Sequence, residues 1–162
     1  TTKQLPFNGV YRLPGALMHQ AGSPPDRAQL QLLIKDLPRP NGIAFSPDEK
    51  YLYVSNSGPR FWMRYTVNAD GSVSNGKVFY DVSNDPAPGG PDGIKVDQKG
   101  NLYGPGPGGV WVLSPQGKHL ATIHIAKPTG NVAWGDADGK TLYITSSASV
   151  YRIKLNIPGK RP

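Results

Sequence analysis

Short stretches rich in β-branched and aromatic residues recur along this chain, and Gly, Pro, Asp or Asn residues separate them. Such stretches are typical of β-strands, and the residues between them are typical of tight turns. Three segments share one pattern: a strand, an acidic turn, and a second strand that begins with Leu-Tyr. They start at Asn41, Asp92 and Gly130. The pattern predicts an all-β protein built from a repeated unit.

The repeat has the length of a propeller blade. The Leu-Tyr pairs start at residues 52, 102 and 142, which gives periods of 50 and 40 residues, the range expected for four-stranded β-propeller blades. One further apolar run precedes each motif and one follows it; the preceding runs are 30–34, 78–82 and 120–125, and the following runs are 61–67, 110–113 and 150–155. We therefore expect a β-propeller domain of about three four-stranded blades, at residues 28–68, 76–114 and 118–156.

The ends of the chain do not complete a blade. Residues 9–13 read as one more strand, so 1–14 is expected to be the end of a preceding blade, and 157–162 a tail. A blade hides its two faces only against neighbouring blades. Each Å² left uncovered costs about 25 cal/mol, so something must cover the two terminal faces. The candidates are a missing N-terminal half of the ring, or a second copy of the chain in a two-fold homodimer.

Charge and residue composition exclude some classes of partner and site. The net charge is +7, but the 18 Lys and Arg residues are scattered, mostly at turns and at the C-terminal end, so we do not expect nucleic-acid binding. No apolar window is long enough to cross a membrane, and we expect a soluble protein, either cytoplasmic or periplasmic/secreted. With no Cys, disulfides, a thiolate nucleophile and Cys-based metal sites are excluded.

The motifs resemble those of a known family. Leu37-Pro-Arg-Pro-Asn-Gly-Ile-Ala-Phe-Ser-Pro-Asp, then Gly89-Gly-Pro-Asp-Gly-Ile-Lys-Val-Asp, then Thr129-Gly-Asn-Val-Ala-Trp-Gly are similar to segments of the senescence marker protein, gluconolactonase and luciferin-regenerating enzyme family. The resemblance runs from about Gly9 to Leu155. It implies the C-terminal half of a six-bladed propeller whose central channel holds one divalent cation, most often calcium, with magnesium, manganese or zinc as alternatives.

The resemblance also implies the metal ligands. In this family they are a Glu from the first blade, the Asn of a Pro-Asn-Gly motif and the Asp of a Pro-Asp-Gly motif; by motif, Asn41 and Asp92 take the last two positions. The first ligand has no candidate, because the only Glu of the chain, Glu49, lies in the hairpin turn of the blade that supplies Asn41. The third metal ligand and the substrate contacts of the earlier blades are therefore expected outside this chain.

The ligand types fit hard cations on chemical grounds, because carboxylate and amide oxygens suit calcium, magnesium or manganese. Asp92 is also the candidate catalytic residue, accepting a proton from an attacking water or orienting it. The alternative is that Asn41-Gly and Asp92-Gly are ordinary turn dipeptides. Asn131 opens the third equivalent strand and so points toward the same channel; it is interpreted as structural, with contact to solvent or a ligand there as the alternative. His19, His119 and His124 have no metal-binding spacing, and Trp62 is assigned to core packing, with a position at the channel mouth as the alternative.

These observations predict metal-dependent hydrolysis of a sugar lactone or a similar small cyclic ester. The chain is expected to supply part of the active site and to be inactive or weak as an isolated half. A second hypothesis is a non-catalytic propeller module that binds a small ligand or a protein partner through its loops, since the fold is widely reused without catalysis.

Overall fold

The computed structural model describes residues 5–14 and 30–161. Within these ranges every regular element is a β-strand, so no helix there could cross a membrane. The strands are β1 (Val10–Arg12), β2 (Gln31–Ile34), β3 (Pro40–Phe45), β4 (Tyr51–Asn56), β5 (Phe61–Val67), β6 (Val73–Asp81), β7 (Lys95–Val96), β8 (Leu102–Gly106), β9 (Gly109–Leu113), β10 (His119–His124), β11 (Thr129–Gly135), β12 (Thr141–Ser146) and β13 (Ser149–Lys154). The prediction of an all-β protein is confirmed.

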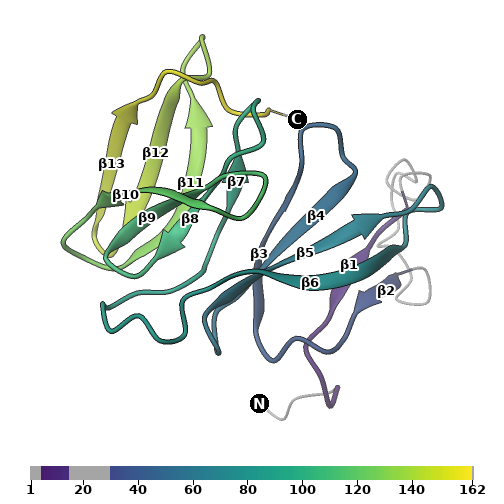
Figure 1. Ribbon diagram of the computed structural model, residues 1–162. Helices are drawn as coiled ribbons and strands as arrows, with labels where there is room; N and C mark the ends of the chain where they lie inside the picture. The colour runs from purple at the N-terminus through teal and green to yellow at the C-terminus, as the bar shows by residue number, and fades with distance from the viewer. Residues whose placement is uncertain (1–4, 15–29, 162) are drawn as a thin grey trace, which may run out of the picture.

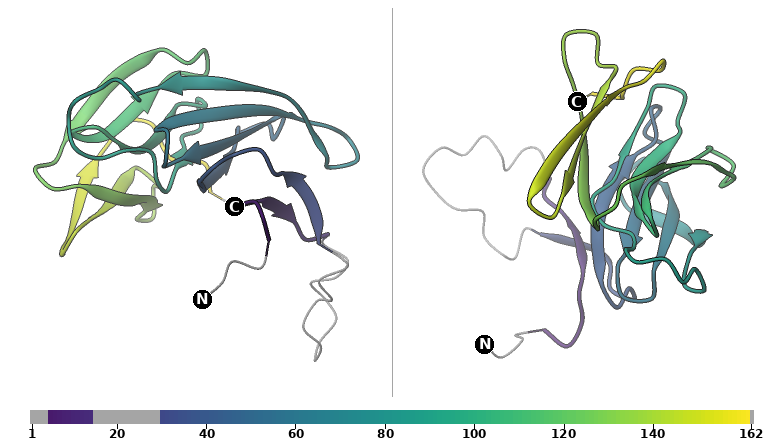
Figure 2. Two further views of the ribbon diagram at one scale, coloured as in Figure 1. Left: turned by 90° about the horizontal axis from the view of Figure 1, so that it is seen from below. Right: turned by 90° about the vertical axis from the view of Figure 1, so that its left-hand side faces the viewer.

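The strands form four antiparallel sheets in chain order (Figure 1). Two sheets are complete meanders of four strands, β3-β4-β5-β6 and β7-β8-β9-β10. A three-stranded sheet, β11-β12-β13, follows them, and a two-stranded sheet, β1-β2, precedes them. The two smaller sheets lie at opposite ends of the array (Figures 1 and 2). Each of the last three sheets begins with the first strand of the repeated strand-turn-strand motif. The strands β3, β7 and β11 are therefore equivalent.

The predicted boundaries between units are wrong by one strand. The apolar run before each motif was assigned to the unit that follows it, at 28–68, 76–114 and 118–156. In the structure each of these runs closes the sheet that precedes it: β2 pairs with β1, β6 with β5, and β10 with β9. The physical reason is hairpin closure, because the turns at 68–72 and 114–118 return the chain directly onto the strand before. The preceding unit was likewise ended one strand too early, because β1 is followed in its sheet by β2 and residues 1–14 do not close it.

The core consists of apolar layers between successive sheets. The central layer joins the two four-stranded sheets and contains Tyr53, Trp62, Val82, Ile94, Val96, Leu102, Trp111 and Leu113. One layer packs β1-β2 against the first of these sheets, and another packs β11-β12-β13 against the second. Trp62 has no exposed surface, so it packs in the core and is not at a channel mouth. Face-to-face stacking of small twisted sheets is the packing of propeller blades.

Apolar side chains are exposed on β3 and on the last strand, β13. On β3, Ile43 and Phe45 are 47% and 48% exposed, and on β13 Val150 is 69% exposed. A groove of about 350 Å³ between β1-β2 and β3 is lined by these two β3 residues together with Leu33, Leu52, Val67 and Val73. β3 is thus partly uncovered beside the two-stranded sheet β1-β2, and β13 lies in the three-stranded sheet at the other end of the array.

Candidate active site

The two predicted ligands lie at the starts of neighbouring innermost strands. Asn41 is the second residue of β3, and Asp92 lies three residues before β7. Asn41 is exposed and Asp92 is partly buried. The Asn41 side chain lies close enough to lower the pKa of the Asp92 carboxyl. Residues 51 positions apart in the sequence are thus neighbours, as the motif pattern requires for a shared site.

Close backbone contact at Gly42 makes this possible. A Cβ at Gly42 would lie only 2.2 Å from the carbonyl oxygen of Asp92 and 2.8 Å from the nitrogen of Ile94. Any side chain larger than hydrogen would push β3 away from the segment that carries Asp92. The Pro-Asn-Gly motif therefore has glycine at position 42 because no larger residue fits there. If Asn41-Gly42 were only a turn dipeptide, this close contact with the Asp92 segment would not be needed.

Two serines, Ser55 on β4 and Ser57 just after it, connect the start of β3 with the Pro91-Asp92 segment. The buried Ser55 Oγ accepts a hydrogen bond from the N–H of Gly42 (2.6 Å) and donates to the carbonyl of Asp92 (2.8 Å). Ser57 Oγ accepts from Asn41 Nδ2 (3.0 Å) and donates to the carbonyl of Pro91 (2.7 Å). Each hydroxyl bonds both β3 and the Pro91-Asp92 segment, so the spacing between Asn41 and Asp92 is fixed by direct contacts.

The electrostatics of Asp92 suit a proton acceptor. Burial is the largest influence and raises the pKa of the Asp92 carboxyl above its ordinary value. The N–H of Gly93, the side chain of Asn41 and the charge of Arg39 act in the opposite direction and offset part of the effect. A desolvated carboxylate binds a proton or a cation more strongly than one in water, because either replaces the lost hydration.

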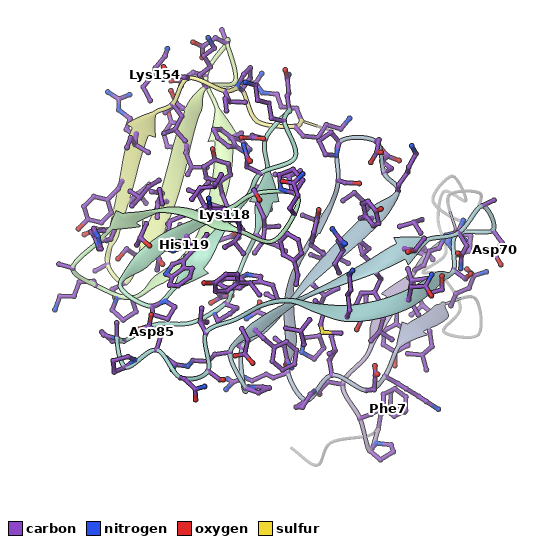
Figure 3. All side chains as sticks on the ribbon, in the orientation of Figure 1. Phe7, Asp70, Asp85, Lys118, His119 and Lys154 are labelled. Carbon is purple, nitrogen blue, oxygen red and sulfur yellow. The ribbon has the colours of Figure 1, made fainter. Side chains whose placement is uncertain are left out.

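Arg60 holds the connection that leads to Asp92. Its guanidinium donates to four main-chain carbonyls between β6 and β7: Ser83 (2.9 Å), Asp85 (2.6 Å), Ala87 (3.4 Å) and Gly89 (3.2 Å). Asp85 marks this connection in Figure 3. The segment has no ladder partner of its own, so one side chain satisfies carbonyls that a sheet would otherwise pair. Arg60 thus shapes the approach to Pro91 and Asp92.

The remaining candidates lie elsewhere. Glu49 is in the β3–β4 turn with a φ of 58° and lines the groove between β1-β2 and β3. His119 stacks on the Trp111 ring, with centroids 3.9 Å apart (Figure 3), His124 is exposed on β10, and His19 lies outside the described residues. Over residues 5–14 and 30–161, His, Asp and Glu side chains do not gather in groups of three that could hold a metal ion.

Sequence reasoning missed Ser55, Ser57 and Arg60. A signal for the serines was present: Ser55-Asn56-Ser57 is a polar run at the end of a strand whose preceding residues are apolar. Buried polar residues in a central strand need partners, and here the partners are the backbone groups of the ligand segments. Arg60 carried no such signal, because its four acceptors follow it by more than 20 residues.

The fold and the position of the site together define the class of protein. Four-stranded antiparallel meanders stacked face to face, with polar residues at the starts of adjacent first strands, are the construction of a β-propeller with a central site. Comparison with family models identifies the family: residues 2–148 match the SMP-30/Gluconolactonase/LRE-like region. The chain belongs to this family, which confirms the resemblance seen in its motifs.

Individual relatives are sugar lactonases by name. The chain is 35% identical to a gluconolactonase of Zymomonas mobilis, over 97% of this chain and 43% of the relative. It is 31% identical to a 6-deoxy-6-sulfogluconolactonase of Pseudomonas putida, over 80% and 50%. The solved structure of XC5397 from Xanthomonas campestris, described as a gluconolactonase, superposes with a TM-score of 0.77 at 31% identity, over 98% of this chain and 47% of that one. The chain spans about half the length of the relatives it matches.

Proposed function

We propose that this chain forms part of the active site of a lactonase that hydrolyses sugar lactones or similar small cyclic esters with the help of a divalent cation. The observation that carries the proposal is the juxtaposition of Asn41 and Asp92, which Gly42, Ser55 and Ser57 hold at one point. Membership of the gluconolactonase-like family and lactonase relatives at 31–35% identity support the reaction class.

The oxygen atoms at this point fit a hard cation. Asp92 offers a partly desolvated carboxylate, and Asn41 has its Nδ2 engaged by Ser57, which leaves Oδ1 for a cation. Calcium, magnesium or manganese suits such oxygen ligands best, and calcium is the first candidate. Two protein ligands are few for such an ion. The third is therefore expected from the remainder of the ring, supplied by a further part of the protein or by a second copy of this chain.

A bound cation would polarise the lactone carbonyl and lower the pKa of a bound water. The residues of this chain then have defined tasks. Asp92 accepts the proton of the water whose oxygen attacks the carbonyl carbon, or orients that water. The ring C–O bond breaks, and the released alkoxide takes up a proton to give the hydroxy acid. Arg60 and the two serines keep Asp92 in place and do not touch the substrate.

Hydrolysis of D-glucono-δ-lactone by the chain tests the proposal, with and without calcium or manganese and after treatment with a chelator. We expect weak, metal-dependent hydrolysis that Asp92→Ala and Asn41→Ala abolish, and cation binding that both substitutions weaken. Asp70→Ala is the matched control, because Asp70 is an exposed carboxylate in the β5–β6 turn (Figure 3). Hydrolysis that survives both the chelator and Asp92→Ala would contradict the proposal. So would a folded chain that neither hydrolyses the lactone nor binds the cations, which would favour a non-catalytic binding module.

A further inference from the structure

A third polar side chain occupies the equivalent position on the next sheet. Asn131 lies at the start of β11, as Asn41 does on β3 and Asp92 does before β7. The three segments are in direct contact: the N–H of Gly93 donates to the carbonyl of Gly130 (3.0 Å), and Asp92 Oδ2 lies 4.0 Å from the position that a Cβ at Gly130 would take. Asn131 is therefore a neighbour of Asp92 in space.

The Asn131 amide lies against the backbone next to Asp92. A Cβ at Gly93 would be 2.1 Å from Asn131 Oδ1 and 2.9 Å from its Nδ2. Gly93 thus leaves the space that the amide fills. The Asn131 side chain nevertheless remains exposed, so it covers the residue after Asp92 on one side and faces open space on the other.

Both asparagines sit at irregularities of their strands. The pairing register of β3 with β4 shifts between Pro40 and Ile43, around Asn41, and that of β11 with β12 shifts between Thr129 and Asn131. Such bulges re-aim side chains and are over-represented beside active sites. Each irregularity lies within two residues of the asparagine on the first strand of its sheet, where it can influence the direction of the amide.

The orientation of the amide determines what it can bind. Asn131 Oδ1 accepts a hydrogen bond from the N–H of Val132 (2.8 Å). A backbone N–H can only donate, so the oxygen end of the amide is fixed toward the backbone. Among the described residues no hydrogen bond from Nδ2 is found, so this nitrogen, which lies beside Gly93, can still donate to a bound molecule. A group that presents N–H donors repels a cation and attracts an acceptor oxygen.

We propose that Asn131 is a substrate-binding residue that donates a hydrogen bond from Nδ2 to a carbonyl or hydroxyl oxygen of the lactone. Asn41 and Asp92 hold the cation, and Asn131 positions the sugar beside them. The Asn131 proposal rests on the proposed function and adds to it the contact that orients the substrate. It takes up the alternative to the structural interpretation of Asn131 that the sequence favoured.

The test uses D-glucono-δ-lactam, a ring analogue that lactone hydrolysis does not consume, and two-dimensional NMR of the ¹⁵N-labelled chain. We expect the side-chain NH₂ signal of Asn131 to shift in a saturable way, together with the backbone signal of Gly93. Asn131→Ala is expected to weaken lactam binding and to raise KM for D-glucono-δ-lactone about tenfold, the value of one lost hydrogen bond. Calcium affinity should not change, which distinguishes a substrate contact from a metal ligand. Asn156→Ala, at an exposed site after β13, is the matched control.

The possible results separate the two proposals. If the lactam shifts Gly93 but leaves the Asn131 side chain unmoved, or if Asn131→Ala weakens calcium binding as Asp92→Ala does, the role given to Asn131 is wrong and the lactonase proposal stands. If a folded chain neither binds the lactam nor hydrolyses the lactone, the proposed function fails and the role of Asn131 fails with it. The spectrum of Asn131→Ala itself reports whether the variant is folded.

Discussion

Substitution of Gly42 by alanine tests the contact on which the site depends. The added Cβ would lie 2.2 Å from the Asp92 carbonyl oxygen, whereas real Cβ atoms hardly ever approach closer than 3.0 Å. Strand β3 and the Asp92 segment must therefore separate by about 0.8 Å or more. Ser55 cannot then keep both of its short hydrogen bonds, 2.6 Å to Gly42 and 2.8 Å to Asp92.

The magnitude follows from these two effects. Overpacking of a tight contact costs about 1–3 kcal/mol, and a weakened hydrogen bond costs about 1 kcal/mol more. The alanine regains about 0.4–1 kcal/mol by restricting the unfolded chain. We expect a net loss of about 2–3 kcal/mol in the free energy of unfolding, measured by urea denaturation followed by tryptophan fluorescence. Lactone hydrolysis and calcium affinity should fall as well, because Asn41 and Asp92 move apart.

Gly58→Ala is the matched control for this experiment. Gly58 is exposed, and the nearest atom to an added Cβ would be Arg39 Cβ at 3.4 Å, an ordinary contact. Its free energy of unfolding should change by no more than about 0.5 kcal/mol, or rise slightly. If Gly42→Ala is as stable as Gly58→Ala and keeps its calcium affinity, the close approach of β3 to the Asp92 segment is not needed, and the reasoning about the site is refuted.

Three further substitutions test how the repeat is held together. Asp97 has no exposed surface, and its carboxylate accepts hydrogen bonds from main-chain N–H groups of its own turn and from the Tyr103 hydroxyl (3.2 Å). Asp97→Ala should therefore lower the free energy of unfolding by about 3 kcal/mol or more. A loss below about 1 kcal/mol would contradict this expectation. Arg60→Ala should increase amide hydrogen exchange in the β6–β7 connection and lower calcium affinity, while exchange in β12 stays unchanged; uniform exchange changes would argue against a local role. Hydrogen bonds from the hydroxyl of Thr141 and, to a smaller extent, that of Tyr143 lower the pKa of the Asp136 carboxyl. The ionised carboxylate therefore stabilises the fold above the ordinary pKa of 3.8, and this stabilisation is lost as pH falls through the lowered pKa. Asp136→Asn should lower the free energy of unfolding, measured by urea denaturation, near neutral pH, and the difference from the unsubstituted chain should vanish in strong acid.

The sequence alone determined which segments are strands. The run 61–67 coincides with β5, and most other runs agree with their strands within two residues, because β-branched and aromatic residues alternate there between bounding turns. The Asn-Gly and Asp-Gly pairs are also visible in the sequence, because each places a glycine directly after a polar side chain. The family and the two predicted ligands followed from these motifs, since a motif is a local property of the chain.

Only the tertiary structure decided which strands pair and which side chains meet. An apolar run between two motifs carries no mark of the neighbour it will join, so the outer strands were assigned one unit too late; the hairpin turns settle the choice by placing β6 on β5 and β10 on β9. Ser55, Ser57 and Arg60 act on backbone groups that are distant in sequence, and Asn131 gains its meaning only from lying against Gly93. Contacts of this kind depend on how twisted sheets stack, which is a property of the packed molecule and not of any segment of its sequence.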